Sequence, residues 1–265
     1  MILIAILIAT LCAGIGSVWV AAVLSFVVLA RYTQHMLSLA AGALLATAFM
    51  HLLPEAFESQ SSAQELFATL LVGLVFFFLL DKAELWHHGH EHHQGPQTDT
   101  VHGHPDHHHG HAHDNPARTG AWAVLTGDSV HAFGDGILIA SAFMADMRLG
   151  FVAALAVLVH EVPHHMGDLV VLRGASSSRR VALLKVSLAG AVTALGGVVG
   201  YGLVDLLHGW LPYFLVVASS SFIYVALADL IPQLQTRLSA RATVAQIAWL
   251  LVGVGLVTLV SRLAH

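Results

Sequence analysis

Residues 127–136 read Gly-Asp-Ser-Val-His-Ala-Phe-Gly-Asp-Gly, and residues 160–168 read His-Glu-Val-Pro-His-His-Met-Gly-Asp, both in otherwise apolar surroundings. If both stretches are helical, His131 and Asp135 share one helix face, as do His160 and His164, because side chains four residues apart are neighbours on a helix. Two such helices packed face to face would offer three imidazoles and one carboxylate to a single cation. This donor set suits zinc and other first-row divalent metals, so the two stretches predict a metal site.

The composition places this site in a membrane protein. The chain of 265 residues is 57% hydrophobic and only 10% charged, with a mean hydropathy of +0.76. These values are too apolar for a water-soluble globule and indicate a multi-pass protein whose surroundings are the lipid bilayer. Nucleic acid is not an expected partner. The single cysteine, Cys12, excludes an internal disulfide and a cysteine-based metal cluster.

Eight segments have the roughly 20 apolar residues that a membrane span requires, which predicts an all-α fold. The first runs longer than a signal-peptide core and lacks a basic flank before it, so we expect it to be retained. The spans are expected at 2–30, 36–57, 64–85, 119–146, 149–173, 181–207, 211–235 and 243–264. They form one integral membrane domain, in which 1–85 holds the first three spans, 86–118 is a loop and 119–265 holds the other five.

The Lys and Arg residues predict the orientation. Alternate loops hold nine of them on one side of the membrane and two on the other. Because basic loops stay in the cytoplasm, both termini are expected on the non-cytoplasmic side, most simply of the cell (inner) membrane. The nine are Arg31, Lys82, Arg118, Arg173, Arg179, Arg180, Lys185, Arg237 and Arg241; the two are Arg148 and Arg262.

The loop at residues 86–118 changes character abruptly, because histidines alternate there with Gly, Asp, Gln and Pro. Such a composition cannot form a core and is typical of a flexible tether whose imidazoles collect metal. Twelve histidines lie in it: His87, His88, His90, His92, His93, His102, His104, His107, His108, His109, His111 and His113.

Polar side chains inside a span are costly, about 2.5 to 3.5 kcal/mol on insertion scales, and usually line a cavity with partners. The fourth and fifth expected spans concentrate such groups. Pro163 removes one backbone hydrogen bond within the fifth span, and Gly134 and Gly136 thin the fourth, so an ion could approach there. Four glycines in the sixth expected span indicate close helix packing: Gly190, Gly196, Gly197 and Gly200.

These motifs resemble the ZIP (Zrt-, Irt-like) metal transporters, particularly the branch with HNFxDG in the fourth helix and HExPHExGD in the fifth. The endings of the second span, His-Leu-Leu-Pro-Glu-Ala at 51–56, and of the seventh, Ala-Asp-Leu-Ile-Pro at 228–232, look like that branch too. The resemblance covers nearly the whole chain. It implies transport of divalent metal toward the cytoplasm, most simply zinc, with His131, Asp135, His160 and His164 as the primary site.

The chain departs from the resemblance at the second metal position that the family often has beside the first. Ala132 stands for the usual Asn, His165 stands for the usual Glu, and the sixth span from 181 to 207 offers no carboxylate in the expected place. We therefore expect one well-formed site, with Glu161 and His165 as an adjoining weak site or a proton-handling pair.

The expected depth of the other polar groups in the membrane indicates where each could act along a transport path. His51 and Glu55 lie toward the outer end of the second span, where they could receive an incoming cation. Asp128, Asp168 and Asp229 lie toward the cytoplasmic side and could form an exit path, although a polar helix end explains Asp229 equally well.

Two other functions stay open. Residues 160–164 also satisfy HExxH, the pattern of an intramembrane zinc metalloprotease, although Pro163 and the extra ligand His131 count against it. A membrane-anchored metal-binding or storage protein would instead use the histidine-rich loop. Iron, manganese and cadmium fit the same donors as zinc, and the sequence leaves a homodimer open.

Overall fold

The computed structural model describes residues 1–27, 33–89, 116–175, 178–234 and 239–263, and within these ranges it contains helices and no strand. The helices form eight rods, as the sequence predicts. The first three rods are α1 (Ile2–Leu11) with η1 (Cys12–Gly16) and α2 (Ser17–Val27); α3 (Thr33–Thr47) with η2 (Ala48–Leu52) and α4 (Leu53–Phe57); and α5 (Ala63–Gly89). The other five are α6 (Pro116–Ala145); α7 (Met147–Ala175); α8 (Arg179–Leu206); η3 (His208–Trp210) with α9 (Leu211–Tyr224), η4 (Val225–Leu230) and α10 (Ile231–Leu234); and α11 (Ala240–Leu263).

Seven of the eight rods are long and apolar enough to cross a membrane. Helix α6 falls below the same threshold because acidic and histidine side chains interrupt its apolar sequence. Large apolar side chains such as Leu71 and Val72 on α5 are more than half exposed, as expected of a surface that faces lipid. The chain is an integral membrane protein.

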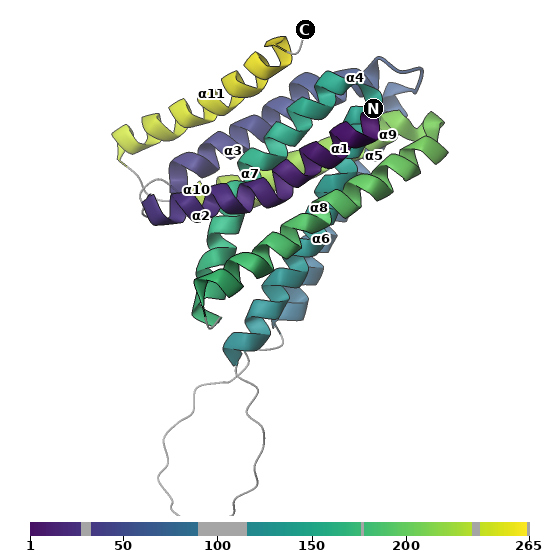
Figure 1. The fold of residues 1–265 in the computed structure, drawn as a ribbon. Coiled ribbons are helices and arrows are strands. Elements are labelled where there is room, and N and C mark those ends of the chain that lie inside the picture. Colours follow the sequence, from purple (N-terminus) through teal and green to yellow (C-terminus); the bar gives the residue numbers. More distant parts are fainter. Residues whose placement is uncertain (28–32, 90–115, 176–177, 235–238, 264–265) are drawn as a thin grey trace, which may run out of the picture.

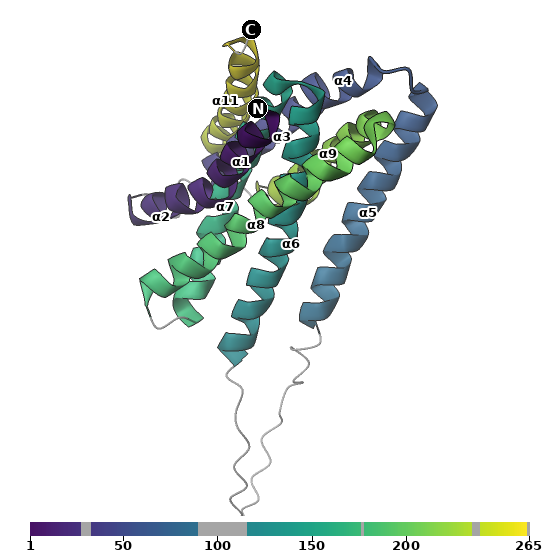
Figure 2. The ribbon, with the colours of Figure 1, turned by 45° about the vertical axis from the view of Figure 1, so that its right-hand side comes forward.

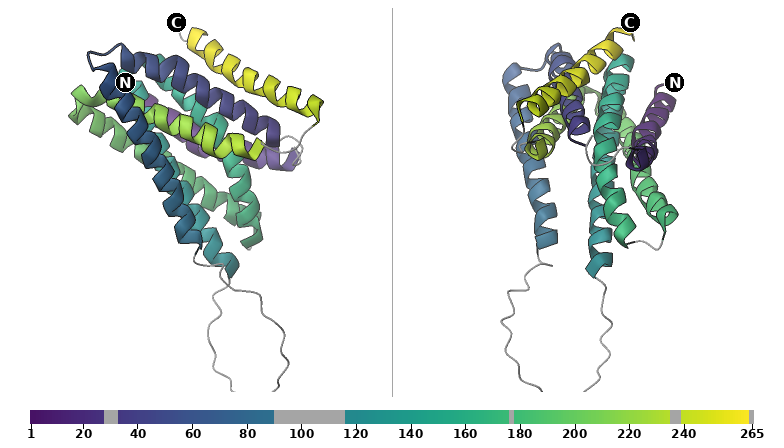
Figure 3. Two further views of the ribbon diagram at one scale, coloured as in Figure 1. Left: turned by 180° about the vertical axis from the view of Figure 1, so that it is seen from behind. Right: turned by 90° about the vertical axis from the view of Figure 1, so that its left-hand side faces the viewer.

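The rods pack as a bundle in which α6 and α7 are neighbours, α8 lies along α6, and α11 lies along α3 (Figures 1 and 2). Helix α5 packs against α9 at the side of the bundle, as the view from behind shows (Figure 3). Both termini lie at the end of the bundle opposite the Gly89 end of α5 and the Pro116 end of α6 (Figure 2). This arrangement fits an even number of spans.

Two of the rods contain a π-helical segment that ends two residues before a proline. Segment η2 precedes Pro54 and segment η4 precedes Pro232. A proline ring clashes with the carbonyl four residues earlier, and a wider turn relieves that clash. Helix α7, in contrast, continues as one α-helix across Pro163.

Glycines allow α6 and α8 to approach closely. A Cβ atom at Gly196 would meet the backbone of Phe133 on α6, and one at Gly136 would meet the backbone of Thr193 on α8. Gly190 likewise faces the backbone of Gly14 in η1. The expected packing role of glycines in the sixth rod is thus confirmed, because small residues let helix backbones approach in lipid.

Candidate metal centre

The junction between α6 and α7 sets the depth of the site residues. Asp146 alone separates the two helices, and its Oδ1 accepts from the backbone N–H groups of Arg148 (2.9 Å) and Leu149 (3.2 Å) as an N-cap. The helices are therefore antiparallel neighbours. His131 lies 15 residues before this turn and His160 lies 14 residues after it, so at 1.5 Å per residue both stand about 21 to 22 Å from it.

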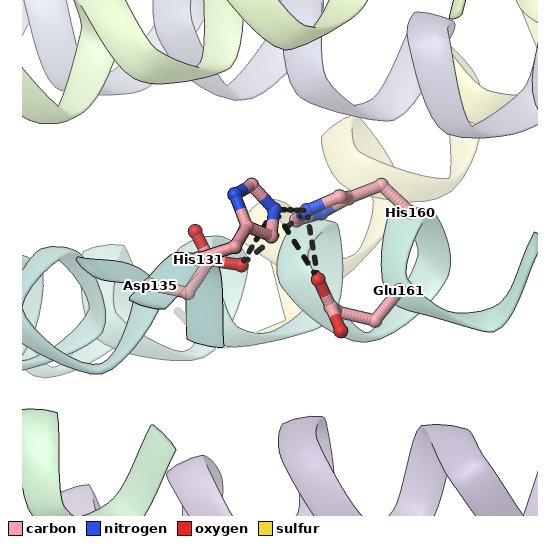
Figure 4. Close-up of side chains that lie close together, drawn as sticks. All are labelled: His131, Asp135, His160 and Glu161. Carbon is pink, nitrogen blue, oxygen red and sulfur yellow. Dashed lines mark hydrogen bonds and ion pairs between the residues drawn. The ribbon is translucent and has the colours of Figure 1, made fainter. Parts of the chain in front are cut away.

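The central cluster contains His131 and Asp135 from α6 and His160 and Glu161 from α7, whose side chains converge (Figure 4). The two Nε2 atoms of the histidines are 3.3 Å apart. Asp135 Oδ2 lies 3.3 Å from His160 Nε2 and 3.8 Å from His131 Nε2. Glu161 Oε1 lies 3.4 Å from each Nε2. Except for His131, all of them are buried.

These separations are close to those of zinc ligands. Ligand atoms about 2.0 to 2.1 Å from a tetrahedral zinc ion are roughly 3.4 Å from one another. The five separations run from 3.3 to 3.8 Å and therefore need little adjustment to surround one ion. Two imidazoles and two carboxylates would neutralise the charge of a divalent cation.

The orientation of His160 suits metal binding. Its Nδ1 lies 3.2 Å from the carbonyl oxygen of Ala156, which only accepts hydrogen bonds, so Nδ1 carries the proton. In a neutral ring the lone pair is then on Nε2, which faces the cluster. Such a partner for the second nitrogen is the usual support of a metal-binding histidine.

Two further groups continue from this cluster, away from the Asp146 turn. The second group is Asp128, Glu161 and His165, and the third group is Asp128, His164 and Asp168. Within each group the donor atoms lie within 4.8 Å of one another, as they do in the central cluster, which is the first group. Glu161 is shared between the first and second groups, and Asp128 between the second and third. The structure thus adds Glu161 to the central cluster and places His164, whose side chain is exposed, in the third group. The His164 ring is still only 5.6 Å from that of His131, centroid to centroid.

A cavity of about 390 Å³ connects the central cluster and the third group with the seventh rod. Asp229 lies on its wall and accepts a hydrogen bond from Gln233 (2.8 Å). Asp81 also lines it and accepts from the Tyr224 hydroxyl (3.1 Å). The expected exit residues therefore border one continuous space with the metal centre, and Asp81 adds a carboxylate that the sequence did not single out.

His51 and Glu55 lie in a second cavity of about 180 Å³, which also borders Glu58, Asp146 and Arg148. Asp146 ends α6, so this cavity is at the opposite end of α6 and α7 from the third group. The histidines at 90–113 that were predicted to collect metal lie outside the described residues, and His87 and His88 are at the end of α5 without described side chains.

The HExxH interpretation requires His160 and His164 to hold one ion while the glutamate activates water. The donor groups separate these two histidines, and Glu161 instead offers its oxygens as ligands to both neighbouring groups. The geometry therefore does not match a metalloprotease site.

Eight helical rods with a buried His/Asp/Glu cluster at mid-depth that could hold a metal ion are the architecture of a multi-pass membrane protein of the metal-transporter class. The family described as ZIP Zinc transporter matches residues 1–261, and the chain belongs to this family. Its members are transporters and not enzymes.

Several zinc transporters are similar to part of the chain. Zinc transporter ZIP10 of Danio rerio is 35% identical over 114 residues, which are 43% of this chain and 14% of that protein. Zinc transporter foi of Drosophila melanogaster is 35% identical over 144 residues, 53% of this chain and 20% of that protein. Zinc transporter ZIP4 of Homo sapiens is 39% identical over 114 residues, which are 42% of this chain and 17% of that protein. The matched part thus spans a fifth or less of each relative.

Proposed function

We propose that this chain moves divalent metal, with zinc as the preferred cargo, into the cytoplasm through the site between α6 and α7. The observation that carries the proposal is the four-residue cluster of His131, Asp135, His160 and Glu161, whose donor atoms lie within 4.8 Å of one another at mid-depth. The names of the similar proteins support zinc as the cargo. Iron, manganese and cadmium are competitors because nitrogen and oxygen donors accept all of them.

The route runs from the cavity at His51 and Glu55 to the central cluster, and from there through the third group to Asp229. Its support is the order of the groups along α6 and α7 and the single cavity that borders both the cluster and Asp229. In this route His164, a member of the third group, receives the ion from the central cluster, since its ring lies beside that of His131. The inward direction of transport rests on the family alone.

Zinc uptake into proteoliposomes tests the central site. We expect His131→Ala to lower the initial rate at least as much as the roughly 10- to 100-fold that loss of even an outer-shell partner costs a metal site. His164→Ala should also lower the rate, because His164 lines the same cavity and its ring lies 5.6 Å from that of His131. His35→Ala is the matched control, because this ring stacks on Trp249 (6.0 Å between centroids) away from the cavity. An unchanged rate in His131→Ala would contradict the proposal. Selectivity is measured separately, as the inhibition of zinc uptake into the parent proteoliposomes by iron, manganese or cadmium ions.

Deleting residues 87–113 tests whether the histidine-rich loop is auxiliary. We expect uptake to continue at a reduced rate, because the ligands of the central cluster all lie on α6 and α7. Uptake of radioactive zinc into vesicles measures transport, and zinc bound to the purified chain in detergent measures metal binding by the spans. Spans that bind no metal after the deletion would instead favour a storage protein whose loop is the binding part.

A further inference from the structure

We propose that Tyr224 is a positioning residue for the transported ion, because its hydroxyl holds the carboxylate of Asp81 at the wall of the cavity of about 390 Å³ that borders the central cluster. This role rests on the proposed function, since it requires that a divalent cation passes through this cavity. Asp81 belongs to α5, and Tyr224 is the last residue of α9, immediately before the π-helical segment η4. Both side chains thus come from helices other than α6 and α7.

Asp81 lies on the face of α5 that borders the cavity. Phe77, Leu80 and Asp81 line it, and their spacing of three and four residues places them on one helix face. Leu79, next to them in sequence, is 58% exposed and belongs to the surface that faces lipid. Because an ionised side chain is costly in lipid, the carboxylate is more stable when it points into the cavity. His160 of the central cluster borders the same space, so Asp81 has access to the path of the ion.

The Tyr224 hydroxyl supplies the contact that orients Asp81. It donates to Asp81 Oδ2 at 3.1 Å, and Tyr224 lines the cavity together with Asp81. Asp81 is exposed, so packing alone does not fix its rotamer. The hydrogen bond uses one lone pair of one oxygen, and a carboxylate has further lone pairs with which to accept a cation. Hydrogen-bond partners of this kind orient the carboxylates that ligate metal ions.

The packing of α5 against α9 has other contacts, so it does not require the Tyr224 hydroxyl. Ser220 Oγ on α9 donates to the carbonyl oxygen of Leu70 on α5 at 3.2 Å. A Cβ atom at Gly73 would meet the Ser220 side chain, which shows how closely the two helices approach there. Loss of the Tyr224 hydroxyl should therefore free the carboxylate without detaching α5.

The chain offers a matched control for this hydrogen bond. The Tyr213 hydroxyl donates to Glu65 Oε2 at 3.0 Å, and this pair also joins α9 to α5 but lies outside the cavity. Tyr224→Phe and Tyr213→Phe each delete one hydroxyl and keep the ring. If the hydroxyl only ties α5 to α9, the two variants behave alike. If it positions Asp81, only Tyr224→Phe changes how the cavity holds an ion.

The experiment loads proteoliposomes of the full chain with unlabelled zinc and measures the initial uptake of radioactive zinc. The lumenal zinc concentration that halves this uptake measures how tightly the cytoplasmic side of the transporter holds zinc, and it does not depend on how many molecules are active. We expect Tyr224→Phe to raise this concentration roughly two- to tenfold, as the loss of one hydrogen bond would. Tyr213→Phe should leave it unchanged. Size-exclusion chromatography confirms that each variant is folded.

A double-mutant cycle tests whether Tyr224 acts through Asp81. Asp81→Asn removes the charge with little change in shape, and it should raise the half-inhibiting zinc concentration at least as far as Tyr224→Phe does. In the double variant, Tyr224→Phe should add nothing further, because no carboxylate is left to position.

An unchanged or lower half-inhibiting concentration in Tyr224→Phe would overturn the proposal. So would an equal change in Tyr213→Phe, which would make the hydroxyl a tie between two helices, or an effect of Tyr224→Phe that persists in Asp81→Asn. Parent vesicles that take up no zinc would instead refute the proposed function, on which this role rests. The two failures are distinguishable, because the first is seen only while the parent still transports zinc.

Discussion

Replacing Glu161 with glutamine is expected to abolish measurable zinc uptake. The substitution keeps the size of the side chain but removes its charge, and the amide offers one oxygen where the carboxylate offers two. Glu161 Oε1 lies 3.4 Å from both His131 Nε2 and His160 Nε2 in a buried position. Two unit charges 4 Å apart interact by about 4 kcal/mol at an effective dielectric constant of 20, which corresponds to roughly a thousandfold loss of zinc affinity.

Initial rates of zinc uptake into proteoliposomes, together with the zinc bound in detergent, measure this effect. Glu65→Gln is the control, because Glu65 is exposed and accepts from the Tyr213 hydroxyl (3.0 Å) outside the metal centre. Uptake in Glu161→Gln that stays within about twofold of the parent would show that the carboxylate is not a ligand, since a lost ligand costs far more.

Much of the central site could be predicted from the sequence. The spacing of His131 and Asp135 places them on one face, and the short connection at Asp146 makes α6 and α7 antiparallel neighbours. His131 and His160 are nearly equidistant from that turn, so they must lie at the same depth. The distance of 3.3 Å between His160 Nε2 and Asp135 Oδ2 agrees with this reasoning.

The rotation of α7 about its axis could not be predicted in the same way. The four-residue spacing of His160 and His164 suggested that both side chains face α6. In the structure Glu161 instead faces the cluster, and His164 is exposed at the cavity. That rotation depends on how α7 packs against α2 and α3, which no local pattern reveals. Asp128 did carry a signal, because positions 128, 131 and 135 share one helix face. Tyr224 carried none, since its contact with Asp81 joins residues far apart in sequence.

The close packing of α6 against α8 leads to a second large expected effect. In Gly196→Ala the new Cβ would meet the carbonyl group of Phe133, which lies two residues from both His131 and Asp135. If α6 moved away from α8 to make room, it would also lose the close approach of the two backbones at Gly136, where a Cβ would meet the carbonyl oxygen of Thr193. We expect a loss of about 1 to 3 kcal/mol in stability, typical of overpacking, and a displaced central cluster that binds zinc poorly.

Gly202→Ala on the same helix is the matched control. Nothing lies within 4 Å of the Cβ position there, so the added methyl group should slightly stabilise α8, by up to the roughly 1 kcal/mol that separates Ala from Gly in a helix interior. The unfolding temperature in detergent should therefore fall in Gly196→Ala and rise slightly in Gly202→Ala, although the two substitutions are chemically identical and only 6 residues apart. Zinc binding should weaken in Gly196→Ala alone. If both variants unfold at the same temperature and bind zinc equally well, the position of the metal ligands does not depend on this contact between helices.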